Sequence, residues 1–340
     1  MNIKAAPKID LSNRSKEVPS IDTWRPRANP QMLHIRAQLY ALIRRFFAEH
    51  SVLEVDPPSL ATTSVTDPNI ESIVAEVGEI SGYLQTSPEF FMKRMLASGI
   101  GDIYALGKAF RDAEQGSRHN PEFTLLEWYR LDWDEFQLIT EVEKLISEVF
   151  HSLGGSKIRI QRLSYSDCFE RELQFDPHTV SLATLQSNVV DLGYKNWANE
   201  TRANCLDLLF CEIVEPNLPE GLVSIFDYPA CQAALAQTYK DKQGRLVSRR
   251  FEVFLNGIEL ANGYFELTDA QQQIQRFEDD IKQRQQTNKP EINLDAQLDQ
   301  AMRAGLPSCS GVALGVDRLL MQLCKVSTID EVLAFPWSRC

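Results

Sequence analysis

The stretch FRDAEQGSRHNPEFTLLEWYRL, residues 110–131, decides how this sequence is interpreted. It contains the polar segment 112–121 between two segments, 103–111 and 122–131, that are rich in apolar and aromatic residues. Short apolar segments bounded by turn-forming residues are typical of β-strands. The stretch therefore predicts two antiparallel strands joined by an unusually long, polar hairpin loop.

One face of the second predicted strand combines an aromatic ring, a carboxylate and a phenol. Side chains alternate along a strand, so that Phe123, Glu127 and Tyr129 point the same way, together with Leu125. The loop adds cationic and amide groups at the edge of this face, namely Arg111, Arg118, His119 and Asn120. Such groups suit phosphate oxygens. From these residues alone, a solvated loop with chance charges remains the alternative.

A second hairpin is predicted around an Asn-Gly turn at 256–257, because Asn-Gly between apolar segments favours a type I′ turn. A two-residue turn pairs Phe254 with Glu259 and Glu252 with Ala261. The two glutamates then lie diagonally on one face, where their charges repel unless a cation binds. Carboxylate oxygens are the ligands that Mg²⁺ prefers, so a metal–nucleotide site is one interpretation, and a solvated sheet face is the other.

The segment 311–318 reads as a strand of small residues that enters a helix. Gly311, Ala313 and Gly315 leave space beside the backbone, and Arg318 stands at the start of the helix. Close packing of backbones explains such spacing as well as ligand binding does. By itself this segment is therefore only weak evidence for a ligand-binding site.

The remainder of the chain provides the frame for these motifs. Residues 1–30 are proline-rich and polar and predict an extended N-terminal arm, ahead of a single domain over residues 31–340. A helix over 31–50 should lead into a short edge strand within 52–58. Residues 156–220 show no chemical cluster and are interpreted as an insertion. Further helices are predicted at 134–153, 269–289, 295–305 and 317–325, and one that begins at Ser87-Pro88-Glu89 with Ser87 as its cap.

Composition excludes several classes of protein. The 340 residues have a formal net charge of -12, which argues against non-specific binding to nucleic acid. No apolar segment is long enough for a membrane span, and no secretion signal opens the chain. The seven scattered cysteines include no C-x-x-C pair, so that disulfides and a structural zinc site are not expected. A cytoplasmic protein is predicted.

The motifs together resemble the catalytic core of the class II lysyl-tRNA synthetases, with the same order and spacing. The resemblance runs from about residue 32 to the C-terminus and is greatest to free-standing paralogs of that core which modify elongation factor P. It rests on Phe110-Arg111, His119 to Thr124, Glu127-Trp128-Tyr129, Glu259 to Gly263 and Gly315 to Arg318. Motif 1 of the family corresponds to residues 55–58, motif 2 to the long-loop hairpin, and motif 3 to residues 315–318.

This resemblance implies an α+β fold, the class II aminoacyl-tRNA synthetase catalytic core, with an antiparallel sheet flanked by helices. It also implies a homodimer formed through the motif 1 helix and strand. Complete lysyl-tRNA synthetases have an N-terminal OB domain that reads the tRNA anticodon and needs on the order of 100 residues. Only about 30 residues precede the core here. Neither an OB domain nor tRNA anticodon binding is expected.

The resemblance also assigns roles to individual residues. Arg111 corresponds to the motif 2 arginine that holds the substrate carboxylate and the ATP α-phosphate, and Arg318 to the motif 3 arginine on the γ-phosphate; both are the expected catalytic residues. Glu252 and Glu259 correspond to Mg²⁺ ligands. Further nucleotide contacts are implied for His119, Asn120, Phe123, which stacks on adenine, Glu259, Leu260 and Gly315. The amino-acid pocket is implied to contain Ser87, Pro88, Glu89, Glu127, Tyr129, Asn262, Glu266 and Ala313.

The charge of this pocket gives a separate argument about the substrate. Glu89, Glu127 and Glu266 would converge where Arg111 is the only positive group. A dicationic amino acid balances these charges, whereas aspartate or asparagine would leave buried carboxylates unpaired. We therefore expect lysine or a lysine isomer as the small-molecule substrate.

Two departures from the synthetase pattern are present. Where synthetases have Arg-x-Glu in motif 2, this chain has Arg111-Asp112-Ala113-Glu114, which displaces the acid by one residue. Asp112, Ala113 and Glu114 are included among the expected nucleotide contacts, but their individual roles are open. Ala313 replaces a glycine of lysyl-tRNA synthetases, and in the resembled family the extra methyl group accompanies a preference for (R)-β-lysine.

The expected function is that of an enzyme, an ATP- and Mg²⁺-dependent ligase that forms an aminoacyl-adenylate and transfers the acyl group to a lysine ε-amine of elongation factor P. No covalent enzyme nucleophile is needed. One alternative is a truncated synthetase that uses α-lysine on tRNA or another amine. The other is a regulatory paralog without activity, for which the displaced motif 2 acid is the only support.

Overall fold

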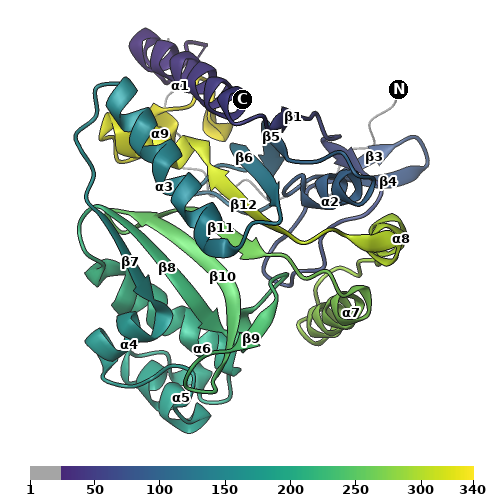
Figure 1. Cartoon of the computed structure of the whole chain (residues 1–340), viewed down its shortest axis with the longest axis vertical. Helices are drawn as coiled ribbons and strands as arrows, with labels where there is room; N and C mark the ends of the chain where they lie inside the picture. Colours follow the sequence, from purple (N-terminus) through teal and green to yellow (C-terminus); the bar gives the residue numbers. More distant parts are fainter. Residues whose placement is uncertain (1–23) are drawn as a thin grey trace, which may run out of the picture.

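A computed structural model describes residues 24–340, and most of the predicted N-terminal arm lies outside this range. Nine of its strands form one large sheet with the order β1-β5-β6-β12-β11-β10-β8-β7, and β9 pairs with β10 at the side (Figure 1). The pairs β1·β5 and β7·β8 at the two edges are parallel and the other pairs are antiparallel. The strands are β1 Leu53–Glu54, β5 Ile103–Phe110, β6 Glu122–Leu131, β7 Ile160–Ser164, β8 Leu222–Pro229, β9 Thr238–Lys240, β10 Leu246–Leu255, β11 Ile258–Phe265 and β12 Cys309–Gly315.

Helices flank this sheet, as the resemblance to class II synthetases implied, and the expected α+β fold is confirmed. α1, α3 and α9 pack in one apolar cluster with the central strands. α2, α7 and α8 contribute to another cluster, which includes Ile103 of β5 and Tyr129 of β6. The helices are α1 Pro30–Glu49, α2 Glu89–Ala97, α3 Glu135–Ser152, α4 Tyr165–Leu173, α5 Leu182–Asp191, α6 Arg202–Leu209, α7 Ala270–Gln286, α8 Ala296–Gly305 and α9 Val316–Cys324.

Two smaller units complete the fold. A three-stranded sheet contains β2 (Leu60–Ala61), β3 (Val74–Val77) and β4 (Ile80–Leu84) in the order β2-β4-β3. The helices α4, α5 and α6 lie within the segment interpreted as an insertion and form an apolar cluster of their own against β8 (Figure 1). That this segment is an insertion into the catalytic core stays a prediction.

Most predicted elements lie where the sequence placed them, because their ends have clear local signals. The Asn29 side chain accepts a hydrogen bond from the Met32 N–H at the start of α1, and Pro30 occupies the first helical turn. Asp134 and Gln137 form a capping box at the start of α3. The predicted start of α2 is wrong by one residue: Pro88 is the cap, and the Ser87 hydroxyl accepts instead from the Glu89 N–H at 3.3 Å.

The register of the β10–β11 hairpin differs from the prediction. Phe254 pairs with Glu259 as expected, but Glu252 pairs with Asn262 and not with Ala261. A β-bulge between Val253 and Phe254 shifts the register by one residue. A bulge adds a residue to one strand, and simple counting from the turn cannot detect it.

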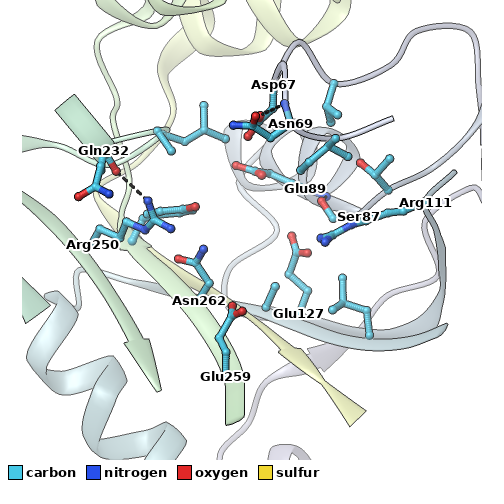
Figure 2. A pocket seen from close by; sticks show the side chains of 18 of the residues that line it. Asp67, Asn69, Ser87, Glu89, Arg111, Glu127, Gln232, Arg250, Glu259 and Asn262 are labelled. Carbon is cyan, nitrogen blue, oxygen red and sulfur yellow. Dashed lines mark hydrogen bonds between the residues drawn. The ribbon is translucent and has the colours of Figure 1, made fainter. Parts of the chain in front are cut away.

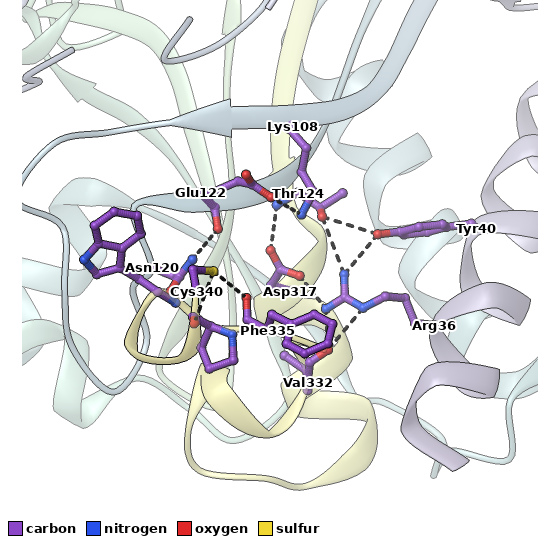
Figure 3. A network of polar contacts seen from close by, with 12 residues as sticks. Arg36, Tyr40, Lys108, Asn120, Glu122, Thr124, Asp317, Val332, Phe335 and Cys340 are labelled. Atoms are coloured by element: carbon purple, nitrogen blue, oxygen red, sulfur yellow. Dashed lines mark hydrogen bonds and ion pairs between the residues drawn. The ribbon is translucent and has the colours of Figure 1, made fainter. Parts of the chain in front are cut away.

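The carboxylate of Asp317 at the start of α9 connects this helix to α1 and β6, and its partner Arg36 adds a fourth segment (Figure 3). It accepts from Arg36 Nη2 of α1 and from the Thr124 N–H of β6, both at 2.6 Å. Arg36 also donates to the Val332 carbonyl oxygen, at 2.7 Å from Nη2. The Asp317 side chain is only 3% exposed, so this ion pair is buried. It fixes the start of α9, and with it the adjacent Arg318.

In the part of the chain that the structure describes, no helix has the length and apolar character needed to cross a membrane. This finding agrees with the absence of a long apolar segment in the sequence.

We expect Asp317→Asn to lower the free energy of unfolding by about 3 kcal/mol, because it leaves the buried Arg36 guanidinium without its counter-charge. Urea denaturation followed by circular dichroism measures this change. Arg44→Ala is a matched control on α1, since its ion pair with Glu54 is exposed and should contribute less than about 1 kcal/mol. An equal loss in both variants would contradict the expectation.

Candidate active site

A cavity of about 710 Å³ lies against the central strands β6, β12, β11 and β10 (Figure 2). It is also bordered by α2, α7, the loop 65–70 and part of α6. Alternation along β6 directs Glu127 and Tyr129 to the cavity, whereas Trp128 between them donates to Glu141 of α3 on the other side of the sheet. The predicted ligand-binding face of β6 therefore lines this cavity.

Glu89, Glu127 and Glu266 all line the cavity, as predicted, although they come from three different elements. The expectation that Arg111 is the only positive group near them is wrong. Lys93 of α2 forms ion pairs with Glu89 at 2.6 Å and with Glu266 at 2.7 Å, and its side chain is 3% exposed. Lys93 follows Glu89 by four residues in the helix and so lies on the same face.

Burial makes this cluster electrostatically unusual. Burial, together with the charges of Glu89 and Glu266, raises the pKa of Glu127 to about 8. The pKa of Glu266 is raised to about 7, because burial outweighs the attraction of Lys93. Tyr129 donates to Glu127 at 2.8 Å, and the second carboxylate oxygen of Glu127 is buried without a partner. The pocket thus holds a proton near neutral pH that a cationic ligand can replace.

The floor of the pocket is shaped by small residues. A Cβ at Gly311 would lie 2.3 Å from the Tyr129 ring and 2.6 Å from a Glu266 oxygen, so only glycine permits both side chains to stay in place. Ala313 pairs with Glu127 on one side and with Asn262 on the other. The side-chain oxygen of Asn262 is buried without a partner and is available to an amine donor.

Arg111 stands at the other side of this pocket. Its Nε is buried without a partner, and its guanidinium lies 5.3 Å from the centre of the Phe123 ring. Glu114 lies 3.4 Å from Nη1. Ala113, which stands between Arg111 and Glu114, has a φ of +59° and is exposed, and this left-handed turn lies in the segment that brings Glu114 to Arg111. Glu114 lines the cavity, whereas Asp112 and Ala113 do not.

Arg318 is held in place by the chain itself. Its Nη1 donates to the Glu259 carbonyl oxygen at 3.0 Å, and Nη2 lies 2.6 Å from Nε2 of His119. Burial and the positive charge of Arg318 lower the pKa of His119, so its neutral ring can accept this bond. His119, Arg318 and Arg111 all line the cavity, and the two arginines present positive charge and N–H donors to it.

The other predicted nucleotide contacts divide into two groups. Phe123, Leu260 and Gly315 line the cavity, and a Cβ at Gly315 would have only ordinary contacts, so the chain leaves space there. Asn120 also lines the cavity, but its amide donates to the Glu122 carbonyl at 2.6 Å and accepts from the Trp337 N–H at 2.9 Å. Asn120 therefore holds the loop against the C-terminal segment, and its contact with a nucleotide stays a prediction.

The two predicted Mg²⁺ ligands are close enough to interact, since the charge of Glu259 helps to raise the pKa of Glu252. Glu252 also accepts from Tyr228 at 2.8 Å and from Arg250 at 2.5 Å, and Glu259 lies 3.4 Å from Arg318. Each carboxylate thus faces an arginine, and Glu259 lines the cavity whereas Glu252 does not, so their role as Mg²⁺ ligands stays a prediction. Among residues 24–340, no group of three or more His, Cys, Asp or Glu side chains is arranged as a metal site. Phosphate oxygens would have to supply the remaining ligands.

The sequence did not predict several residues of the site, of which Lys93 pairs with two cavity residues without lining the cavity itself. Lys93 had a usable signal, its i+4 spacing from Glu89. Arg250 and Gln232 line the side of the cavity across from Glu89 and Arg111 (Figure 2). There Arg250 donates to the Gln232 carbonyl at 2.9 Å. The wall also includes Asp67 and residues 203–204 of α6, whose approach depends on long-range packing that no local pattern predicts.

The fold and this cavity agree with the comparison to known families. The sequence model of the tRNA synthetases class II (D, K and N) matches residues 15–339. The chain belongs to this family.

Three curated relatives match nearly their whole length. The protein of Pseudoalteromonas translucida is 44% identical over 329 residues, which cover 94% of this chain and 99% of the relative. The proteins of Erwinia tasmaniensis and Yersinia enterocolitica are 42% and 41% identical, over 94% and 93% of this chain and 98% of each relative. All three have the name elongation factor P–(R)-β-lysine ligase.

The raised pKa of Glu127 predicts a cost in stability. Between its ordinary value of 4.5 and about 8, the folded chain keeps a proton that the unfolded chain has lost, so the folded state becomes less stable as pH rises through this window. We expect Glu127→Gln to raise the free energy of unfolding by about 1 kcal/mol or more at about pH 8.5, and by much less at about pH 5.

Chemical denaturation at the two pH values measures this difference. Glu122→Gln is the matched control, because Glu122 lies on the same strand with its side chain 51% exposed. A stabilisation by Glu127→Gln that is independent of pH would contradict the role assigned to burial.

Proposed function

We propose that this protein is an ATP-dependent ligase that activates (R)-β-lysine and attaches it to a lysine ε-amine of elongation factor P. The observation that carries this proposal is the buried pocket of Glu89, Glu127 and Glu266 beside the unpaired Nε of Arg111. The three relatives named as such ligases, which match this chain almost end to end, support the same activity.

The charges of the pocket suggest how the amino acid is oriented. The carboxylate of the substrate would bind Arg111, whose buried Nε lacks a partner within the chain. Its two ammonium groups would bind among Glu127, Glu89 and the free oxygen of Asn262. Since Lys93 neutralises one of the three carboxylates, two negative charges remain for two ammonium groups. A monocationic or acidic amino acid would leave this buried charge unbalanced.

The nucleotide would occupy the part of the cavity next to Phe123, with its phosphates between Arg111 and Arg318. In the first step, a carboxylate oxygen of the amino acid attacks the α-phosphorus of ATP, and pyrophosphate leaves. Both arginines neutralise negative charge that spreads over the phosphates during this displacement. Glu252 and Glu259 would hold Mg²⁺, which supplies further charge neutralisation at the phosphates when bound.

In the second step, the unprotonated ε-amine of the acceptor lysine attacks the carbonyl carbon of the adenylate. An amide bond forms, the amine loses its proton, and AMP leaves with the electron pair of the broken bond. Binding both reactants in one cavity supplies orientation, and no enzyme nucleophile takes part. The buried cysteines in this part of the structure agree with a passive role, since burial raises the pKa of the Cys309 thiol.

We also propose that the protein acts as a homodimer in the cytoplasm. Support for the dimer comes from the edge strand β1, where Leu53 is 54% exposed, and from Trp24 and Trp337, which are 71% and 59% exposed. Exposed apolar side chains and an open sheet edge are typical of association surfaces. Sedimentation velocity would test this state.

We expect elongation factor P to gain one lysyl-sized mass when it is incubated with this protein, Mg-ATP and (R)-β-lysine, and to gain less with α-lysine. Intact-mass spectrometry measures the gain. Arg111→Ala should slow the reaction by about 10³-fold, because it removes the positive charge proposed to hold both the substrate carboxylate and the α-phosphate.

Two controls distinguish the alternatives. Charging of purified tRNA with α-lysine, without any mass gain on elongation factor P, would show a truncated synthetase instead of the ligase. The absence of amino-acid-dependent pyrophosphate exchange would show a paralog without activity. Arg303→Ala, which removes an exposed ion pair with Asp299 and does not line the cavity, should leave the mass gain intact.

The methyl group of Ala313 is expected to influence which isomer binds, since Ala313 lines the cavity between Glu127 and Asn262. We expect Ala313→Gly to change the ratio of kcat/KM for (R)-β-lysine over α-lysine by about tenfold in favour of α-lysine, the usual effect of one methyl group in a pocket. Pyrophosphate exchange with each isomer gives the ratio. An unchanged ratio would assign the preference to other residues.

A further inference from the structure

We propose that Lys93 is a positioning residue that leaves the amino-acid pocket with two uncompensated negative charges. The pocket would therefore prefer substrates with two ammonium groups. Lys93 does not line the cavity, and it would act only through Glu89 and Glu266, which do. The proposal rests on the proposed function, because the substrate it selects is the amino acid of that reaction.

The geometry gives Lys93 this role. Its ammonium lies 2.6 Å from Glu89 of α2 and 2.7 Å from Glu266 at the end of β11, so one cation joins the helix to the sheet. The exposed fractions are 3% for Lys93 and 1% for Glu266. The Glu89 side chain is 16% exposed, and a bridge between two largely buried carboxylates fixes the positions of both oxygen atoms.

The charge count follows from these contacts. Glu89, Glu127 and Glu266 contribute three negative charges, and Lys93 contributes one positive charge, which leaves two. Without Lys93, three carboxylates would share a buried site, and like charges at close range raise each other's pKa. A second proton would then be held up to a higher pH than in the wild type, and the match to a diammonium ligand would be reached only at that higher pH.

Among residues 24–340, Lys93 is the only cation that forms an ion pair with Glu89 or Glu266, although Arg111 and Arg250 also line the cavity. On β6 and β12, the groups nearest to it are Glu127 and Cys309, and burial keeps that thiol protonated. Tyr129 and Tyr264 also remain neutral, because burial raises the pKa of both. Where α2 and α8 pack against each other, their side chains are apolar and offer no charge, as in Met92, Leu96, Leu298 and Met302. Lys93 is therefore the cation on which the two carboxylates depend.

The test compares Lys93→Met, which removes the charge, with Lys93→Arg, which keeps it. Amino-acid-dependent pyrophosphate exchange is measured from pH 6 to 9 with (R)-β-lysine and α-lysine, and with 6-aminohexanoate as the single-ammonium analogue. For Lys93→Met we expect the midpoint of the rise of kcat/KM with pH to move upward by about one unit or more. The preference for diammonium substrates at pH 7 should fall about tenfold, while the KM for ATP changes less than about twofold.

Charge matching gives a second comparison. Lys93→Met/Glu266→Gln restores two negative charges and should return the midpoint toward that of the wild type, as should Lys93→Arg. If Lys93→Met alone does not fold, the effect of losing Lys93 is measured between Glu266→Gln and the double variant. The midpoint of the double variant should lie above that of Glu266→Gln.

Three outcomes decide the matter. An upward shift that charge matching reverses supports the proposal. A loss of kcat/KM by the same factor at every pH, with the KM for ATP rising in parallel, would show that Lys93 is only structural and would overturn it. A wild-type protein that exchanges pyrophosphate with neither lysine isomer would overturn the proposed function, and this inference together with it.

Discussion

The buried carboxylate of Asp317 is the interaction on which the arrangement of the cavity depends. It accepts from Arg36 of α1 and from the Thr124 N–H of β6, while the next residue, Arg318, faces the cavity. A charged hydrogen bond without water is directional as well as strong. Consequently, helix α9, whose first turn belongs to motif 3, cannot rotate without also displacing β6, the strand that carries Glu127. The hydrogen bonds of Asp317 therefore hold together both the packing of α1, β6 and α9 and the position of Arg318 in the site.

The cavity is an example of stability sacrificed for binding. Three acids of the amino-acid pocket are brought together out of water, and the pKa values of Glu127 and Glu266 are raised as a result. Unpaired buried atoms accompany them, including Nε of Arg111 and the side-chain oxygen of Asn262. Polar atoms that the folded chain leaves unpaired are costly, and such costs are found where a ligand is expected to satisfy them.

Local chemistry explains which features the sequence predicted. The strands around the long loop, the Asn-Gly hairpin and most helix ends are set by neighbouring residues, so their positions follow from alternation, capping and turn preferences. The β-bulge after Val253 and the ion pairs of Lys93 were not predicted, because each depends on segments that meet only in the folded chain. The contribution of α6 to the cavity wall was missed for the same reason. Motif residues supplied most of the site, while its charge balance required the structure.

The left-handed backbone at Ala113 has a consequence for comparing sequences. Ala113 stands at the position of the acid in the Arg-x-Glu pattern and is exposed, while Glu114, one residue later, lies 3.4 Å from Arg111. An alignment without a gap at this point would pair Ala113 with the acid of the synthetases and would report a lost functional group. The contact between Glu114 and Arg111 is visible only in the folded loop, so a missing acid in an aligned column is weak evidence that a relative has lost its activity.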